Sequence, residues 1–270
     1  MSETEQAEKD FPFDIAIVGL GIVGVHQITR EVEETIRRCR QTFVVDSGFG
    51  VVRYLESLCG EVTSLVPLYE TGKSRLSTYR RMAAEVVNAA IACPPVAFAS
   101  YGHPLVYCFP TALIRRAAKI LNLRVEVLPG VSALDTLLVD LGIDFADNGL
   151  QVYEATDLLL RRRPVQSDVP CVLWQANVFA DLTYQTHRRA ADQFKPLQDY
   201  LLQFYPPDHP IKLVISKTFP LLRSIVETYR IGTLAVDLEN GPQAGTLYIP
   251  PVTQRAIEDQ QLFETLTTQS

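Results

Sequence analysis

The sequence predicts a two-domain α/β protein whose first domain is built on a parallel β-sheet. Short β-branched segments alternate with amphipathic helical patterns from residue 14 to about residue 141. Strands that alternate with helices form parallel sheets covered on both faces. Apolar residues make up 47% of the 270 residues and charged residues 21%, which suits a globular protein with substantial cores. Turn-forming residues cluster at 142–149, where we place the change of domain.

The domain organisation follows from these patterns. We expect a disordered lead-in over residues 1–13, a first α/β domain over 14–145, a second α/β domain over 146–251 and a polar tail over 252–270. The lead-in is polar and acidic and lacks the apolar core of a signal peptide. No apolar run of the sequence approaches the roughly 18 residues that a membrane span needs. The sequence therefore predicts a soluble, cytoplasmic protein.

Charge and cysteine usage exclude several functional classes. The formal net charge is -6, so no overall basic field favours nucleic acid. The basic run at 161–163 is expected to be a solvated helix end. The five cysteines are widely spaced without a Cys-x-x-Cys pair, and the four histidines include no His-x-x-x-His pair. We therefore predict a reducing compartment, no disulfide framework and no metal site.

In the first half, the apolar patterns predict a regular alternation of strands and helices. Gly72 marks a turn, and Ser74 is a candidate N-cap for the helix that follows it. Strands are expected at 14–18, 42–45, 96–98 and 124–128, and helices at 28–39, 51–58, 75–92, 111–121 and 133–141.

In the second half, the patterns are less regular. The last strand is expected to stop at Pro250 and Pro251, because proline cannot donate a ladder hydrogen bond. Strands are expected at 150–153, 171–175, 211–216 and 245–249, helical stretches at 155–162, 186–204 and 221–229, and short structure at 233–235.

A glycine motif, Gly19-x-Gly21-x-x-Gly24, follows the first strand, and Asp46 ends the next. This combination matches the dinucleotide-binding fingerprint, although a glycine motif alone is a weak signal. A phosphate cradle needs a helix that starts at once, whereas residues 26–29 leave the helix start ambiguous. We favour a structural cap or turn role for Asp46, and an NAD(P)-dependent oxidoreductase remains the alternative.

Two polar turns follow neighbouring strands. Tyr101-Gly102-His103-Pro104 comes after one strand, and Pro129-Gly130-Val131-Ser132-Ala133 after the next. Open α/β sheets hold ligands at the carboxyl ends of their strands, so the two turns predict a ligand crevice. Ser132 is also expected to cap the following helix. Elsewhere, Arg75 and Tyr79 are i,i+4 neighbours on a helix, and Tyr69 in the preceding loop is able to fold back towards them.

These motifs in this order resemble the tetrapyrrole methylase superfamily. The resemblance implies a two-domain α/β methyltransferase that binds S-adenosylmethionine in the cleft between its domains, usually as a homodimer. Most members carry Gly-Asp-Pro where this chain has Gly102-His103-Pro104. That loop, with Tyr69, Arg75-x-x-x-Tyr79, Trp174-Gln175 and residues 246–251, is similar to the borosin branch. Borosin enzymes α-N-methylate the backbone amides of a ribosomally made peptide.

The resemblance also implies roles for individual residues. Tyr69, Arg75 and Tyr79 match the catalytic positions, and Val66 stands where the family has another catalytic tyrosine. The implied cofactor contacts are Gly21, Tyr101, His103, Val106, Tyr107, Ser132, Ala133, Gln175, Gly245 and Thr246.

The expected substrate is a separate precursor peptide bound in trans. Fused members of the branch carry a clasp domain and their own Val/Ile-rich peptide after the methyltransferase, whereas residues 252–270 are polar. Two alternatives remain beside the oxidoreductase. One is a methyltransferase of the same superfamily that acts on a porphyrinoid, a diphthamide precursor or rRNA, and the other is a non-catalytic peptide-binding module.

Overall fold

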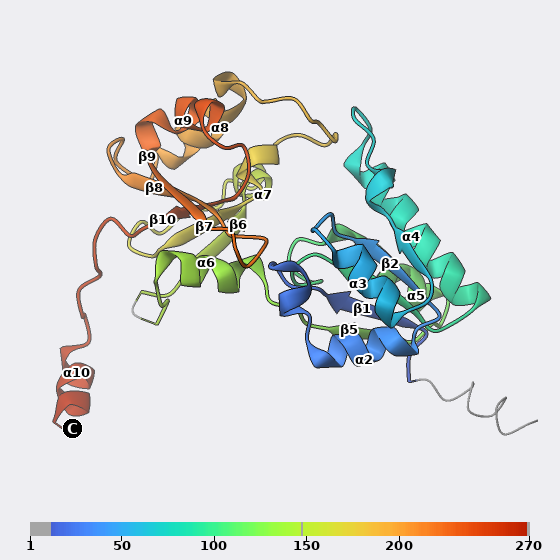
Figure 1. Ribbon diagram of the computed structural model, residues 1–270. Coiled ribbons are helices and arrows are strands. Elements are labelled where there is room, and N and C mark those ends of the chain that lie inside the picture. The colour runs from blue at the N-terminus through green and yellow to red at the C-terminus, as the bar shows by residue number, and fades with distance from the viewer. Residues whose placement is uncertain (1–11, 147, 269–270) are drawn as a thin grey trace, which may run out of the picture. The chain divides into compact units, whose positions relative to one another are not determined.

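The computed structural model describes residues 12–146 and 148–268, which divide into two compact units (Figure 1). The first unit runs to Leu141 and includes two later segments, Asp181–His187 and Ser216–Ser224. The remaining residues from Gly142 onwards form the second unit. Most of the predicted lead-in lies outside the described residues. In the part of the chain that is described, no helix has the length and apolar character to cross a membrane.

The first unit contains the predicted parallel sheet. Its strand order is β3-β2-β4-β1-β5, and every pairing is parallel. The central strands β1 and β4 are buried along their whole length, as expected where helices cover both faces. The short edge strand β3 is an addition to the predicted set. The strands are β1 (Ile15–Gly19), β2 (Gln41–Val45), β3 (Val62–Ser64), β4 (Val96–Ser100) and β5 (Val125–Leu128).

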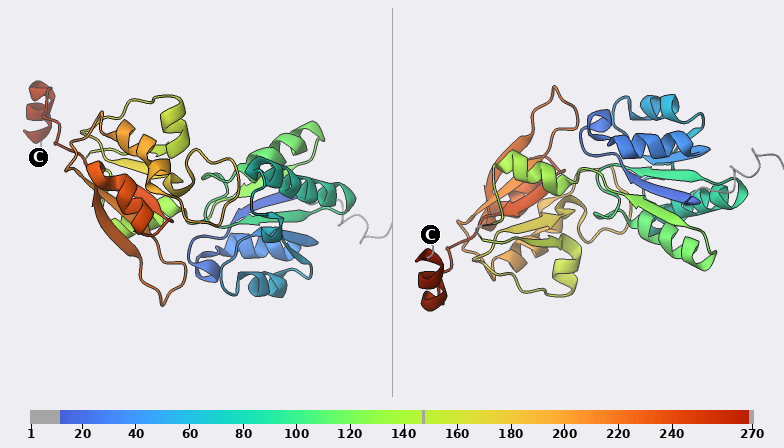
Figure 2. Two further views of the ribbon diagram at one scale, coloured as in Figure 1. Left: turned by 90° about the horizontal axis from the view of Figure 1, so that it is seen from above. Right: turned by 90° about the horizontal axis from the view of Figure 1, so that it is seen from below.

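Helices pack on both faces of this sheet. On one face lie α2 (Arg30–Arg38) and α3 (Val51–Leu58), which bury Val32, Ile36 and Leu55. On the other lie α4 (Arg75–Ala92) and α5 (Phe109–Ile120), which bury Met82, Val86 and Ile114. The right panel of Figure 2 shows the blue pair and the teal-to-green pair on opposite sides of the strands. The remaining elements of this part are η1 (Gly24–Gln27), η2 (Val66–Leu68) and α6 (Ala133–Leu141).

The second unit has a mixed sheet in the order β6-β7-β10-β8-β9. Only β6 and β7 pair in parallel among its described strands. Phe194, Leu197 and Leu234 lie in the core between this sheet and its helices. The elements are β6 (Gln151–Glu154), α7 (Ala155–Leu160), β7 (Cys171–Trp174), η3 (Ala176–Val178), α8 (Ala191–Leu201), β8 (Pro210–Ile215), β9 (Ile225–Arg230), η4 (Ile231–Thr233), α9 (Leu234–Asn240), β10 (Thr246–Ile249) and α10 (Gln260–Thr267).

Two expected helices of the second half differ from the structure. The stretch 221–229 was expected to be helical, but β9 begins at Ile225 and pairs antiparallel with β8. Its β-branched residues favour a strand once a partner edge is available. The expected helix 186–204 is shorter, since α8 spans Ala191–Leu201. In both cases long-range pairing or packing decides the local structure.

Candidate functional site

Three loops meet through glycines at the carboxyl ends of β1, β4 and β5. Gly21 and Gly102 exchange backbone hydrogen bonds, with N···O distances of 3.2 and 2.8 Å. A Cβ atom on Gly19 would lie 2.6 Å from both the carbonyl oxygen of Gly102 and the nitrogen of Gly130. Only glycine permits so close an approach of backbones. The glycine motif therefore serves to pack the two predicted turns against the first loop.

Two backbone amides of the same loop, where a pyrophosphate cradle would lie, are already paired within the loop. The backbone amides of Ile22 and Val23 donate to the Oε1 of Gln27, at 2.7 and 2.9 Å. The short helix η1 follows Gly24 directly, and the α-helix begins only at Arg30. A phosphate site at a helix N-terminus needs unpaired amides there, and here a side chain of the loop already occupies them. This geometry argues against the oxidoreductase alternative.

The loop after β4 carries four of the predicted cofactor contacts of the first unit, Tyr101, His103, Val106 and Tyr107. The Nδ1 of His103 accepts a hydrogen bond from the amide of Leu105 at 3.1 Å. A neutral imidazole with this arrangement carries its proton on Nε2, so that edge is a donor. Tyr107 adopts a left-handed backbone with φ of 52°. The side chains of Tyr101 and Tyr107 are each 44% exposed, which leaves aromatic surface open to a ligand.

Ser132 caps α6, as predicted. Its hydroxyl donates to the Oδ2 of Asp135 at 2.7 Å and accepts from the Asp135 amide at 3.3 Å. The helix starts at the next residue, Ala133. The carboxylate of Asp135 also accepts from the Ser132 amide at 2.6 Å, so the two residues form a reciprocal cap.

The remaining predicted cofactor contacts form a group of their own in the second unit. Gln175 follows β7 and has a left-handed backbone with φ of 57°. Gly245 precedes β10, and Thr246 begins it. Because β7 and β10 are antiparallel neighbours, the carboxyl end of β7 and the start of β10 lie side by side at the same end of these strands.

The three predicted catalytic residues lie together at the start of α4. The rings of Tyr69 and Tyr79 meet edge to face, with centroids 6.3 Å apart. Burial raises the pKa of Tyr69, the neighbouring Tyr79 raises it further, and the Arg75 guanidinium acts in the opposite direction. Tyr69 therefore keeps its proton at neutral pH and is a hydrogen-bond donor.

A further aromatic residue, Tyr184, joins this cluster from the segment Asp181–His187. Its ring lies 5.1 Å from that of Tyr69, and the Arg75 guanidinium lies 5.6 Å from its centroid. Backbone hydrogen bonds link Tyr184 to Gly72 and Lys73, at 2.8 and 2.9 Å. The Nε of Arg75 also donates to the carbonyl oxygen of Thr183 at 3.0 Å. Sequence reasoning missed this residue because no local pattern predicts a pairing between segments 108 positions apart.

The second returning segment, Ser216–Ser224, is held to α6 by hydrogen bonds from its two end residues. The hydroxyls of Ser216 and Ser224 both donate to the carboxylate of Asp140, at 2.5 and 2.7 Å. Farther along the segment, the ring of Phe219 contacts those of His26 and Phe49, with centroids 6.2 and 6.3 Å apart. No pattern in the sequence predicts this contact with the glycine loop.

A pocket of about 540 Å³ lies among these elements. Tyr69, Tyr101 and Tyr184 line it together with Asp46 and Val66. Burial, and secondly the nearby Asp46 carboxylate, raise the pKa of Tyr101 to about 12. The Oδ1 of Asp46 accepts from the amide of Gly48 at 2.6 Å, which confirms the predicted turn role. The structure thus places Tyr69, one of the three candidate catalytic residues, and Tyr101 of the loop after β4 in the wall of one pocket.

Comparison with known proteins places the chain in a family. Residues 14–214 match the family of tetrapyrrole (corrin/porphyrin) methylases. A methyltransferase/ribosomally synthesized type I borosin cyclic peptide precursor of Coprinopsis marcescibilis is 32% identical over 242 residues, which are 88% of this chain and 62% of that protein. The methyltransferase/omphalotin A precursor of Omphalotus olearius is 31% identical over 245 residues, 90% of this chain and 58% of that protein. The chain thus spans about three-fifths of these relatives.

Solved structures agree on the fold. Uroporphyrin-III-C-methyltransferase from Thermus thermophilus superposes with a TM-score of 0.62 at 19% identity, covering 90% of this chain and 94% of that one. A diphthine synthase superposes with a TM-score of 0.59 at 15% identity, covering 94% of both chains. Together with the match over residues 14–214, this shows that the chain belongs to the tetrapyrrole methylase family and has borosin methyltransferase precursors among its relatives.

Proposed function

We propose that this protein is an S-adenosylmethionine-dependent methyltransferase that α-N-methylates backbone amides of a ribosomally made precursor peptide. One observation carries the proposal: Tyr69, Arg75 and Tyr79 converge with Tyr184 beside the pocket that Tyr101 also lines. The relatives that are named both methyltransferase and cyclic peptide precursor support a peptide as the substrate.

The residues of the loop after β4 fit the cofactor. The exposed rings of Tyr101 and Tyr107 offer aromatic surface, and the Nε2 proton of His103 suits a carboxylate or hydroxyl acceptor. We propose that these residues hold S-adenosylmethionine with Val106, Gly21, Ser132 and Ala133, and with Gln175, Gly245 and Thr246 of the second unit. When bound, the cofactor supplies an electrophilic methyl group.

The amide substrate sets the chemical problem. Its nitrogen is a poor nucleophile because the lone pair is delocalised into the carbonyl group. Methylation therefore requires loss of the N–H proton and stabilisation of negative charge on the carbonyl oxygen. Tyr69 keeps its proton and donates to that oxygen in the manner of an oxyanion hole. The positive charge of Arg75, held against the Tyr184 ring and the Thr183 carbonyl, adds to this stabilisation.

Tyr79 is the proposed proton acceptor. During methyl transfer the amide N–H bond would break, the amide proton would pass to the hydroxyl oxygen of Tyr79, and the hydroxyl's own proton would leave to solvent. Tyr79 lies on the first turns of α4, one turn after Arg75, and its ring meets that of Tyr69 edge to face. The aromatic walls limit water around the reacting groups, and their fixed geometry aligns the amide for transfer.

We further propose that the peptide is supplied in trans to a homodimer. The printed names of the relatives join a methyltransferase to a precursor peptide, which makes such a peptide the expected partner. The test incubates the purified protein with S-adenosylmethionine and a synthetic Val/Ile-rich peptide, and co-expresses it with small proteins encoded beside it. We expect mass increments of one methylene on backbone amides by tandem mass spectrometry.

Two results would overturn this assignment. One is the absence of backbone methylation on both peptide sources under conditions where calorimetry detects S-adenosylmethionine binding. The other is methylation of uroporphyrinogen III instead of peptide. Sedimentation of a monomer would remove the dimer from the proposal without affecting the reaction.

A further inference from the structure

The carboxylate of Asp46 is buried with one oxygen unused. The side chain ends β2 and is 7% exposed. Its Oδ1 accepts from the Gly48 amide, but its Oδ2 is buried and finds no hydrogen-bond partner within the described part of the chain. Buried polar atoms are nearly always paired in folded proteins, and an unpaired one costs stability. An oxygen left in this state is expected to serve a ligand that donates a hydrogen bond.

Asp46 belongs to the walls of two adjoining pockets. The first is the pocket of Tyr69, Tyr101 and Tyr184, and the second has a volume of about 590 Å³. Both pockets share a wall made of Asp46, Ser47, Gly48, Phe49 and Val66. The two pockets therefore adjoin at the Asp46 carboxylate.

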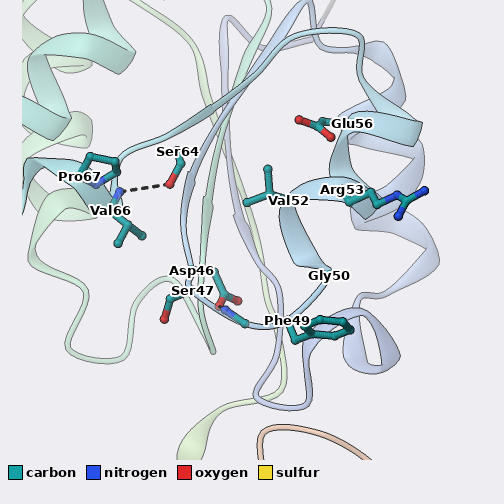
Figure 3. A pocket seen from close by; sticks show the side chains of 11 residues that line it. Asp46, Ser47, Phe49, Gly50, Val52, Arg53, Glu56, Ser64, Val66 and Pro67 are labelled. Atoms are coloured by element: carbon teal, nitrogen blue, oxygen red, sulfur yellow. Dashed lines mark hydrogen bonds between the residues drawn. The ribbon is translucent and has the colours of Figure 1, made fainter.

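The second pocket offers a mainly apolar surface with charges at its border. Figure 3 shows Asp46 and Ser47 at the end of the strand, with Val66 and Pro67 on one side and residues of α3 on the other. Phe49 contributes an exposed aromatic ring to this lining. Arg53 and Glu56 are exposed on α3. The lining suits an apolar side chain on a backbone that donates hydrogen bonds.

We propose that the second pocket binds the peptide residue next to the reacting amide, and that the Oδ2 of Asp46 accepts a hydrogen bond from a backbone N–H of that peptide. The inference rests on the proposed function and assigns its substrate subsite. An extended peptide repeats its backbone groups about every 3.3 Å, so it presents an N–H close to the reacting amide. Such a donor would stabilise the ionised carboxylate, whose pKa burial raises.

The substitution Asp46→Asn tests the hydrogen bond with little change of shape. The amide oxygen of asparagine still accepts from Gly48, while its NH₂ group replaces Oδ2 and turns an acceptor into a donor. We expect the KM for the Val/Ile-rich peptide to rise roughly tenfold, with the dissociation constant of S-adenosylmethionine unchanged by calorimetry. Glu85→Gln is the matched control, since it removes an exposed carboxylate of α4 that lines neither pocket and should leave both values unchanged.

A depsipeptide series identifies the atom concerned. Replacing the amide that flanks the methylation site by an ester removes the N–H and keeps the chain length. The wild-type protein should bind this peptide about tenfold more weakly, whereas Asp46→Asn should not distinguish ester from amide, as expected for coupled partners. Equal discrimination by both proteins would overturn the proposal. An equal loss of cofactor affinity in Asp46→Asn would also overturn it and would assign Asp46 to the cofactor.

The outcome is separable from that of the proposed function. Methylation by the wild-type protein decides the function, and the comparison of variants decides the subsite. If no methylation is seen, peptide binding by calorimetry replaces KM in the same comparison. Unchanged peptide affinity in Asp46→Asn would then reject the subsite.

Discussion

Two neighbouring regions of the first unit differ in how they are packed: the loops at the ends of β1, β4 and β5, and the side chains at the end of β2 and the start of α4. At the ends of β1, β4 and β5, backbones approach through Gly19, Gly102 and Gly130, and neighbouring polar groups find partners within the loops. At the end of β2 and the start of α4, large side chains gather around a pocket. There, Asp46 keeps an unpaired buried oxygen, and tyrosine rings line the space.

The difference indicates what each region contributes. The glycine region fixes the positions of the strand ends and gains stability from close, satisfied contacts. The tyrosine region retains groups that lower stability but are able to act on a ligand, as expected of functional sites. Substitutions in the first region should therefore affect folding, and substitutions in the second should affect activity.

The largest effect is expected from Gly130→Ala. The new Cβ atom would lie 2.5 Å from the carbonyl oxygen of Gly102 and 2.8 Å from the Cα of Gly19, and both obstacles are backbone. We expect the free energy of unfolding to fall by about 3 kcal/mol or more, measured by denaturant titration. Gly60→Ala is the control, because nothing lies within 4 Å of a Cβ there. Similar losses in both variants would contradict the close-packing argument.

Next in size is the effect of Tyr79→Phe on the reaction. Removing the proposed proton acceptor should lower the single-turnover rate by about 10²–10⁴-fold, with little change in unfolding free energy. Tyr54→Phe provides a matched control. The Tyr54 hydroxyl donates a hydrogen bond to Glu33 of α2, on the face of the sheet that α2 and α3 cover. A variant that methylates at the wild-type rate would remove Tyr79 from the mechanism.

Tyr184 should act through its ring. The ring contacts Tyr69 and lies under the Arg75 guanidinium, so Tyr184→Ala releases both groups, whereas Tyr184→Phe retains the contact. We expect a loss of about 10–100-fold in kcat/KM for the alanine variant and near wild-type activity for phenylalanine. A phenylalanine variant as impaired as the alanine variant would show that the hydroxyl is needed instead.

How far the sequence predicts this site depends on the range of the interactions. The parallel sheet, the Ser132 cap and the Asp46 turn follow from local patterns, because β-branched runs and capping side chains act over a few residues. Arg75 and Tyr79 meet through helical spacing. The position of Tyr184 depends on backbone hydrogen bonds between segments that are distant in the sequence. The formation of β9 depends on its pairing with β8. The unpaired oxygen of Asp46 appears only once the surrounding packing is known.

The smallest effect is a gain of stability in Asp46→Asn. Burial raises the pKa of Asp46 above its ordinary value, so the folded state disfavours its charge. The stability associated with this group is present at low pH and is lost as the pH rises through the raised pKa. The titratable side chains that line the two pockets beside Asp46 are Arg53, Glu56, Tyr69, Tyr101 and Tyr184.

The asparagine variant should therefore melt at the wild-type temperature in acid and slightly above it at neutral pH, as measured by calorimetry across the pH range. Asp14→Asn should show the opposite sign, because hydrogen bonds from Arg124 lower the pKa of Asp14. The stability from that pair is present at neutral pH and is lost as the pH falls through the lowered pKa. A melting difference for Asp46→Asn that is negative at neutral pH would mean that the charge stabilises the fold. Asp46 would then be a residue that stabilises the fold, and the distinction between the stabilising glycine loops and the functional pocket would not hold for it.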